Sequence, residues 1–282
     1  MEDTELKDTM NRTFLIREEG FPLTSVADYV LTISLGPEYL RLSVVNPITN
    51  RCGWLEEFAL TTAGSEEEYL SAVQQLVGTH EILTKNFWKL VRVVVSNQSF
   101  TLVPASLFRK EYAARCLSLA KGAIADHEFV HHTVHAQWEA VNVFSLGTQL
   151  AEWFFENYPF ETIHVHHQVD LLLEMATRFP EDGLLLYLEK HAATLLFIRG
   201  GKLHYCNRFL FRTGADLLYY LLFAISELKI DAEHIPAWAF GEITEDDELY
   251  KGLYKYLGEL KPGLPDSLNL PAVSGDVPLY VY

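Results

Sequence analysis

The chain has 282 residues, of which 22 are Lys or Arg and 38 are Asp or Glu, so its formal net charge is −16. This acidic balance excludes nucleic acid as an expected partner, because a nucleic-acid backbone is bound by a basic surface. The three cysteines, at positions 52, 116 and 206, lie far apart, which argues against a disulfide framework and favours a reducing compartment. We expect a cytoplasmic protein without a signal peptide or a membrane span. The first ten residues are acidic, and the longest uncharged apolar run, 217–225, is about half the length of a span.

The first part of the chain predicts an arm followed by a compact unit. Residues 1–26 are expected to form an N-terminal arm, because the first 24 are polar and mixed in charge. Alternating and β-branched runs then predict strands over 29–35, 39–45 and 52–60. Ser65, with Glu68 three residues later, has the pattern of a capping box and predicts a helix to about residue 77. Residues 90–95 are a continuous apolar run that predicts a buried strand.

The same order of elements returns in the last third of the chain. Strands are predicted over 184–188, 193–198 and 203–211, and a helix opens at Thr213 with Asp216 as its capping partner. Because residues 217–225 are apolar on every side, we expect this helix to be buried nearly all round. A buried strand over 236–240 and a helix from Thr244 to about residue 257 follow.

The two stretches match element by element, with Leu35 on Leu188 and Val45 on Ile198. This match indicates one supersecondary unit used twice, and chance recurrence of a common order is the alternative. Between them, residues 101–182 predict a helix over 105–120 and then alternating strands and helices, which implies parallel pairing. We expect a first domain over 27–182 with additional elements and a second over 183–282.

Three segments carry a resemblance to known proteins: Phe-Thr-Leu-Val-Pro-Ala-Ser-Leu-Phe at 100–108, Tyr-Cys-Asn-Arg-Phe at 205–209 and Asp-Leu-Leu-Tyr-Tyr at 216–220. Together they resemble an uncharacterised bacterial family, domain-of-unknown-function family 3822. The repeated βββαβα order resembles the actin-like ATPase superfamily. The resemblance implies an α/β fold in which two ribonuclease-H-like halves form an actin-like arrangement. The layout also looks like the cytoplasmic actin-like domains of pilus-assembly and type II secretion scaffolds.

The superfamily resemblance implies two phosphate-binding hairpins with Asp-x-Gly and a glycine-rich adenosine loop. At the matching positions the first hairpin has Ser34 and Gly36, the second has Tyr187 and Glu189, and the adenosine loop is reduced to Gly241. Without the carboxylates, Mg²⁺ and a transferred phosphoryl group lose their electrostatic support. These five residues therefore define a degenerate nucleotide cleft, for which we expect no ATP binding, no cofactor and no catalytic residue.

Histidine is the other candidate for chemistry, because seven of the 11 histidines fall in two clusters, 127–135 and 164–167. His131 and His135 would share one face of a helix, which is a common zinc geometry, and His164 and His166 would share one face of a strand. A metal site is an alternative if the fold joins the clusters. We expect no metal, because no carboxylate or cysteine completes a ligand set at a recognised spacing.

Basic residues on the predicted strand 203–212 form a third candidate, since Asn207, Arg208 and Arg212 would offer an anion or a protein partner a contact in an acidic protein. The alternative is a solvated face or ion pairs with acids such as Asp216. Our leading hypothesis is a non-catalytic binding or scaffold protein with an unidentified protein partner. The alternatives are a divergent ATP-dependent phosphotransferase or ATPase, and a histidine-dependent metalloprotein.

Overall fold

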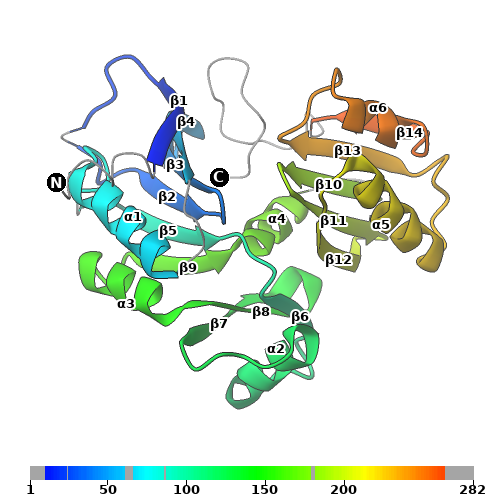
Figure 1. Cartoon of the computed structure of the whole chain (residues 1–282), viewed down its shortest axis with the longest axis horizontal. Coiled ribbons are helices and arrows are strands. Elements are labelled where there is room, and N and C mark those ends of the chain that lie inside the picture. The colour runs from blue at the N-terminus through cyan, green and yellow to red at the C-terminus, as the bar shows by residue number, and fades with distance from the viewer. Residues whose placement is uncertain (1–9, 24, 61–65, 86, 179–181, 264–282) are drawn as a thin grey trace. The chain divides into compact units, whose positions relative to one another are not determined.

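The structure is a computed structural model that describes residues 10–263, except 24, 61–65, 86 and 179–181. It divides into two compact units (Figure 1), the first ending at Leu171 and the second beginning at Leu172. The division falls inside helix α4 (Gln168–Ala176). Ser65, expected to cap the first helix, lies outside the described residues.

The first unit is built on a six-stranded sheet in the order β1-β4-β3-β2-β5-β9. Strands β2, β3 and β4 form an antiparallel meander, and β5 and β9 extend it in parallel from β2. Helices α1 and α3 pack on one face of this sheet, where they share a hydrophobic core with its strands. The bounds are β1 (Met10–Arg17), β2 (Val30–Leu35), β3 (Tyr39–Asn46), β4 (Arg51–Leu60), α1 (Glu66–Thr79), β5 (Leu90–Val95), α3 (Thr148–Asn157) and β9 (Ile163–His167).

Strand β1 is a difference from the sequence prediction, which expected only a loosely held arm at this end. It pairs antiparallel with β4, from Met10 opposite Leu60 to Arg17 opposite Trp54. Polar and apolar residues alternate only in part along its sequence, MNRTFLIR. The sequence pattern alone therefore does not identify the strand, whereas its pairing with β4 does.

A separate three-stranded sheet follows β5. It corrects the predicted parallel pairing for the strand over 140–146, whereas the strand predicted over 162–167 does pair in parallel, with β5. Strand β8 (Ala140–Gly147) pairs antiparallel with both β6 (Phe100–Pro104) and β7 (Glu128–His135), and α2 (Ala113–Lys121) packs against it. The link from β7 to β8 contains only the short 3-10 helix Ala136–Trp138 and Glu139, and a link this short suits antiparallel strands. A second 3-10 turn, Lys110–Tyr112, precedes α2, so the helix predicted over 105–120 begins only at Ala113.

The second unit has a five-stranded sheet in the order β12-β11-β10-β13-β14, with α5 and α6 sharing a core with its strands. Its strands are β10 (Gly183–Glu189), β11 (Ala192–Arg199), β12 (Lys202–Leu210), β13 (Pro236–Gly241) and β14 (Glu259–Pro262). Helix α5 (Gly214–Glu227) begins with the predicted capping box, because Thr213 and Asp216 bond each other's backbone. The N-cap of helix α6 (Glu248–Tyr254) is Asp247, not the predicted Thr244.

The two sheets repeat one topology, because β4-β3-β2-β5-β9 has the same pattern of antiparallel and parallel neighbours as β12-β11-β10-β13-β14. They also share an irregularity. The register of the second and third meander strands shifts between Val44 and Val45 in the first unit, and between Phe197 and Ile198 in the second. Since the sequence match places Val45 on Ile198, the β-bulge occurs at the same position of both units.

Helix α5 does not have the all-round burial that its sequence predicts. Leu217, Leu221 and Ala224 lie in the core, whereas Tyr219 is 66% exposed and Phe223 is 57% exposed. The helix covers one face of its sheet, and no described element covers its outer side in the second unit. That prediction of burial was wrong, while the prediction of the helix itself was right. None of the helices within the described ranges is long and apolar enough to cross a membrane.

Candidate functional site

The turn of the first hairpin, between β2 and β3, is filled by an aromatic ring. A Cβ atom placed on Gly36 would lie 2.2 Å from Cε1 of Tyr39, so this ring rests directly against the glycine. The Gly36 N–H donates to the Tyr39 carbonyl at 2.9 Å, and the Tyr69 hydroxyl donates to the Gly36 carbonyl at 3.3 Å. The Gly36 N–H, one of the backbone groups that could bind an approaching phosphate, is therefore already used within the hairpin.

Ser34 lies at the buried end of β2 with Arg41 opposite it on β3. The buried guanidinium of Arg41 lies 4.6 Å from the Tyr39 ring centroid and donates from Nε to Glu57 at 2.9 Å. A cation and an aromatic ring thus occupy the surroundings of this hairpin. The Glu57 carboxylate on β4 is held by Arg41 of the neighbouring strand β3.

The second hairpin places Tyr187 and Glu189 at the end of β10. Tyr187 is completely buried, with its ring 5.3 Å from that of Phe240 on β13. The Glu189 carboxylate is also buried and forms an ion pair with the guanidinium of Arg208 from β12. The one acidic side chain of this hairpin therefore carries a compensated charge rather than an open metal-binding oxygen.

Gly241 ends β13 beside β10, and the structure gives a backbone reason for the glycine. Its φ is +97°, and an added Cβ would lie 2.2 Å from the Leu188 carbonyl oxygen. Residue 242 then donates its N–H to that same carbonyl at 2.8 Å. Gly241 thus lies next to Tyr187 and Glu189 in the second unit, at a close approach of two backbones.

The three residues of the predicted anion face are placed differently from one another. Arg208 is buried against Glu189, whereas Asn207 and Arg212 are exposed. Arg212 precedes α5, and its backbone N–H donates to the Asp216 carboxylate at 3.1 Å. Arg212 thus remains as an exposed cation, while Arg208 is part of the interior.

The fold brings the two histidine clusters together around a residue that the sequence analysis missed, Asp170. His131 and His135 lie on the strand β7, not on the predicted helix, because β7 pairs with β8 along its whole length. Asp170, in the first turn of α4, is completely buried. Its carboxylate accepts from His135 Nε2 at 2.7 Å, Asn142 Nδ2 at 2.9 Å, Thr133 Oγ1 at 3.1 Å and the His167 N–H at 2.8 Å.

Burial alone would raise the pKa of Asp170, but the hydrogen bond from His135 and the other three donors outweigh it and lower the pKa below its usual value. The carboxylate is therefore ionised with its hydrogen-bonding capacity used. The one sequence signal for Asp170 is its position three residues after His167. An acidic residue at that spacing can accept a hydrogen bond from the backbone N–H at the start of a helix, as Asp170 does from His167.

Two other histidines of this region, His131 and His166, are neutral at pH 7. Burial lowers the pKa of His166 to about 4, and burial also lowers that of His131. His166 Nδ1 lies 3.8 Å from Asp170 Oδ2, which is a contact of a neutral ring at pH 7 rather than an ion pair. His164 is exposed beside it on β9. Within the described ranges, no three His, Cys, Asp or Glu side chains converge as a metal site.

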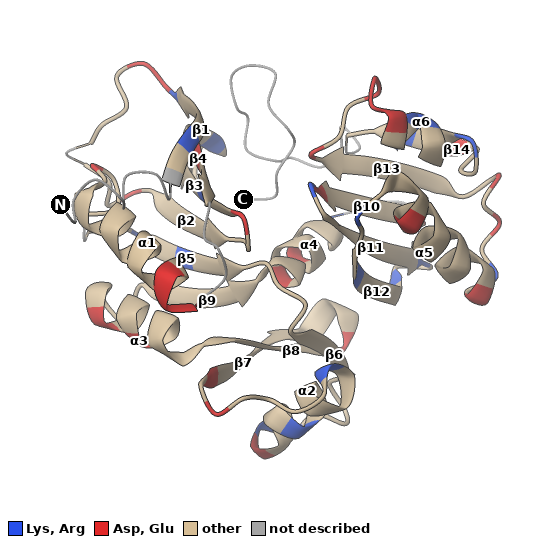
Figure 2. Ribbon diagram, in the orientation of Figure 1, with Lys and Arg blue, Asp and Glu red and all other residues tan. Residues whose placement is uncertain are grey.

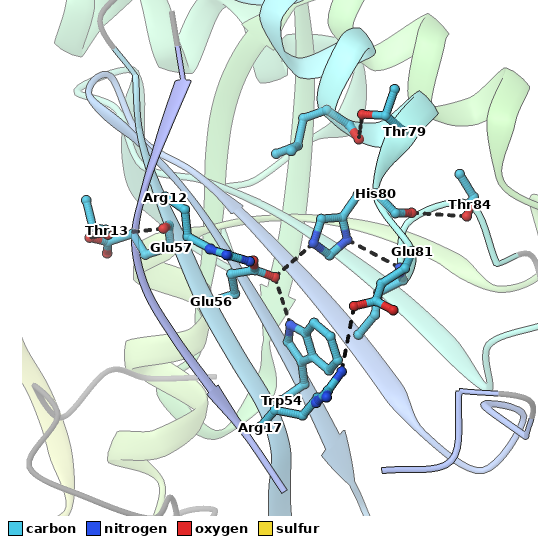
Figure 3. A network of polar contacts seen from close by, with 12 residues as sticks. Arg12, Thr13, Arg17, Trp54, Glu56, Glu57, Thr79, His80, Glu81 and Thr84 are labelled. Carbon is cyan, nitrogen blue, oxygen red and sulfur yellow. Dashed lines mark hydrogen bonds and ion pairs between the residues drawn. The ribbon is translucent and has the colours of Figure 1, made fainter. Parts of the chain in front are cut away.

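A second buried carboxylate, Glu56 of β4, also went unnoticed in the sequence (Figure 3). It accepts from Trp54 Nε1 at 2.9 Å, from His80 at 2.8 Å and from Arg12 of β1 at 3.3 Å. His80 Nδ1 accepts the Ile82 N–H at 3.3 Å, so the proton lies on Nε2, which donates to Glu56. The network joins β1, β4 and the end of α1, so we assign it a structural role.

Comparison with known proteins supports the fold. The chain matches the solved structure of a Bacteroides thetaiotaomicron protein with an actin-like ATPase fold and unknown function, with a TM-score of 0.76, 20% identity and coverage of 86% of this chain and 93% of that one. It is also similar to a chain of the PilM-PilN type IV pilus biogenesis complex, with a TM-score of 0.54, 15% identity and coverage of 86% and 90%. No curated protein matched the sequence.

These likenesses and the repeated sheet topology show an actin-like ATPase fold, as the sequence predicted. The model of one protein family, described as a protein of unknown function (DUF3822), matches residues 18–260. The chain therefore belongs to the DUF3822 family.

Proposed function

We propose that this chain is a non-catalytic binding or scaffold protein that uses an actin-like ATPase fold without holding a nucleotide. The observation that carries the proposal is the state of the two hairpins. Gly36 is covered by the Tyr39 ring, and Glu189 is neutralised by Arg208. Transfer of a phosphoryl group depends on a metal ion and on groups placed to stabilise developing charge. Each hairpin, taken by itself, lacks a carboxylate at the first position of the Asp-x-Gly pattern, where Ser34 and Tyr187 stand, and lacks an open glycine turn.

The similar structures favour a role in binding another protein. The PilM chain of similar fold was solved in a complex with another protein, PilN. Such a fold can therefore serve as a surface for assembly, because function depends on sites rather than on the fold itself. The same role here would not need the hairpin chemistry.

Calorimetric titration of the purified chain with Mg·ATP tests the proposal. We expect no binding heat and no change in melting temperature at millimolar Mg·ATP. A ligand present at about 100 times its Kd would stabilise the native state by roughly 2.7 kcal/mol, which is readily measured. Saturable binding that is lost on Glu189→Gln would contradict the proposal and favour a divergent ATPase or phosphotransferase. The exposed Glu248→Gln variant serves as the matched control.

A further inference from the structure

The second unit has an open strand edge at β12. The Phe211 N–H donates to the His191 carbonyl at 3.0 Å, which fixes the direction of the alternating backbone groups. The N–H groups of Phe209 and Asn207 therefore point toward β11, and those of Arg208 and Leu210 point away from it. In the described part of the chain, no strand pairs with this outer edge. An unprotected edge of this kind is a template for another strand.

An aromatic face lies next to this edge. Tyr220 of α5 stacks on Phe209 of β12, with ring centroids 5.5 Å apart and an interplanar angle of 6°. Tyr219 contacts Tyr220 at 5.6 Å and Phe223 at 6.4 Å between ring centroids, and all three side chains are exposed. Exposed apolar patches mark interaction sites, and aromatic side chains are enriched at interfaces between proteins.

The charge along the edge specifies the occupant. Residues 199–212 contain four basic and no acidic residues in a chain of net charge −16, and β12 shows basic and no acidic colouring (Figure 2). Arg208 is compensated by Glu189, but Arg199, Lys202 and Arg212 are exposed. A second copy of β12 paired antiparallel would bring Lys202 of one chain toward Arg212 of the other, and this repulsion disfavours self-pairing.

We propose that the β12 edge and the aromatic face of α5 form a docking site for an extended acidic segment of a partner protein, which adds as a sixth strand. This inference deepens the proposed function and rests on it. Backbone groups of Arg208 and Leu210 hydrogen-bond the added strand. Alternate apolar side chains of that strand lie toward Tyr220, and its carboxylates lie toward Lys202 and Arg212. Backbone pairing then gives affinity, and the side chains give selectivity.

The test uses the full chain and a display library of random peptides with the length of β12, nine residues. The most enriched peptide is synthesised and its affinity measured by fluorescence anisotropy. We expect an acidic peptide with alternating apolar residues. Its binding weakens at least about tenfold in Lys202→Glu/Arg212→Glu, as for charge reversal at a complementary interface. The exposed pair Lys229→Glu/Lys255→Glu, which makes the same charge change away from β12, leaves the affinity unchanged.

Hydrogen exchange adds a readout that only strand addition moves. In the complex, the amides of Arg208 and Leu210 become protected, while that of Phe209, already bonded to β11, changes little. Leu210→Pro removes one outward donor and should weaken binding without touching the β11 ladder. Enrichment of no peptide, enrichment of neutral or basic peptides, or unchanged affinity in Lys202→Glu/Arg212→Glu would overturn the inference. Self-association that this pair abolishes would overturn it too. None of these results involves Mg·ATP, so the proposed function is tested separately.

Discussion

Glu189 and Arg208 form a buried ion pair that joins the end of β10 to β12 across β11. Each residue was expected in a separate candidate site, Glu189 in a nucleotide cleft and Arg208 on a partner face. In the structure they are partners, and each neutralises the buried charge of the other. Because β12 is an edge strand, the pair also fixes the strand that we propose as a docking edge.

The first prediction concerns this pair. Arg208→Met leaves the Glu189 carboxylate buried without its cation, and we expect a loss of about 3–5 kcal/mol in the free energy of unfolding. The double variant Arg208→Met/Glu189→Leu should recover most of this loss, because well-packed apolar side chains replace a buried ion pair with little penalty. Urea denaturation of the two variants measures the difference. Equal stability of the single and the double variant would show that the pair is not coupled.

The second prediction concerns Asp170. Asp170→Asn removes the charge and two of the acceptor roles that four donors require, and should destabilise the chain by about 2–3 kcal/mol at pH 7. The exposed Asp126→Asn is the matched control and should change stability by less than about 0.5 kcal/mol. Since the pKa of Asp170 is lowered, its contribution is present above the ordinary carboxyl range. It is lost as the pH falls through the folded-state pKa. A variant as stable as the control would contradict this account.

The third prediction concerns the neutral His166. Its folded pKa of about 4 is below the unfolded value of 6.5, so the unfolded state binds the extra proton between these pH values. Stability should therefore fall as the pH drops from 6.5 to 4, by up to about 3 kcal/mol from this group. His166→Asn should flatten that part of the profile, and His127→Asn, an exposed control, should not. A profile that keeps its slope in His166→Asn would assign the effect to other groups.

The fourth prediction compares two members of the Glu56 network. Glu56→Ala leaves Trp54 and His80 with buried donors and should cost about 3 kcal/mol, because a buried carboxylate with several partners is lost. Arg12→Ala should cost at most about 1 kcal/mol, since its side chain is more than half exposed to water. Thermal unfolding of both variants measures the two losses in the free energy of unfolding. An equal loss in both would mean that the attachment of β1, rather than Glu56 burial, controls stability.

Much of the fold was predictable because it depends on local patterns. Residues close in sequence predict each meander and the cap formed by Thr213 with Asp216. The correspondence of Val45 with Ile198 follows from comparing these local patterns between the two units. The strand β7 was not predicted, since the i, i+4 histidine spacing is also compatible with one face of a strand. Its pairing with β8 decides between the two.

The polar networks were not predictable in the same way. The Asp170 cluster joins side chains from β7, β8 and α4, so only tertiary structure shows that His135 and Asn142 reach one carboxylate. The exposed face of α5 is a similar case. An apolar helix predicts burial, but the pattern does not say what covers it, and Tyr219 and Phe223 lie uncovered in the second unit.

Gly241 shows how the structure changes the choice of experiment. A bulky substitution at this position is an obvious probe of the adenosine loop, but Gly241→Trp would place a Cβ against the Leu188 carbonyl at a φ of +97°. Loss of any activity in that variant would report misfolding. Glu189→Gln is the better probe, because it keeps the shape of the side chain. Since it also leaves Arg208 buried without its anion, urea denaturation of the variant first establishes that it is folded.

Steady-state phosphate release from Mg·ATP tests the central claim most directly, because it reports catalysis whatever the partner is. The purified full chain and its Glu189→Gln variant are compared at the same millimolar Mg·ATP concentration. We predict that both release phosphate at the rate of buffer alone, since the one acidic side chain of the second hairpin is paired with Arg208 and Gly36 is covered by Tyr39. Turnover by the wild-type chain that disappears in Glu189→Gln would contradict the account and identify the chain as an enzyme.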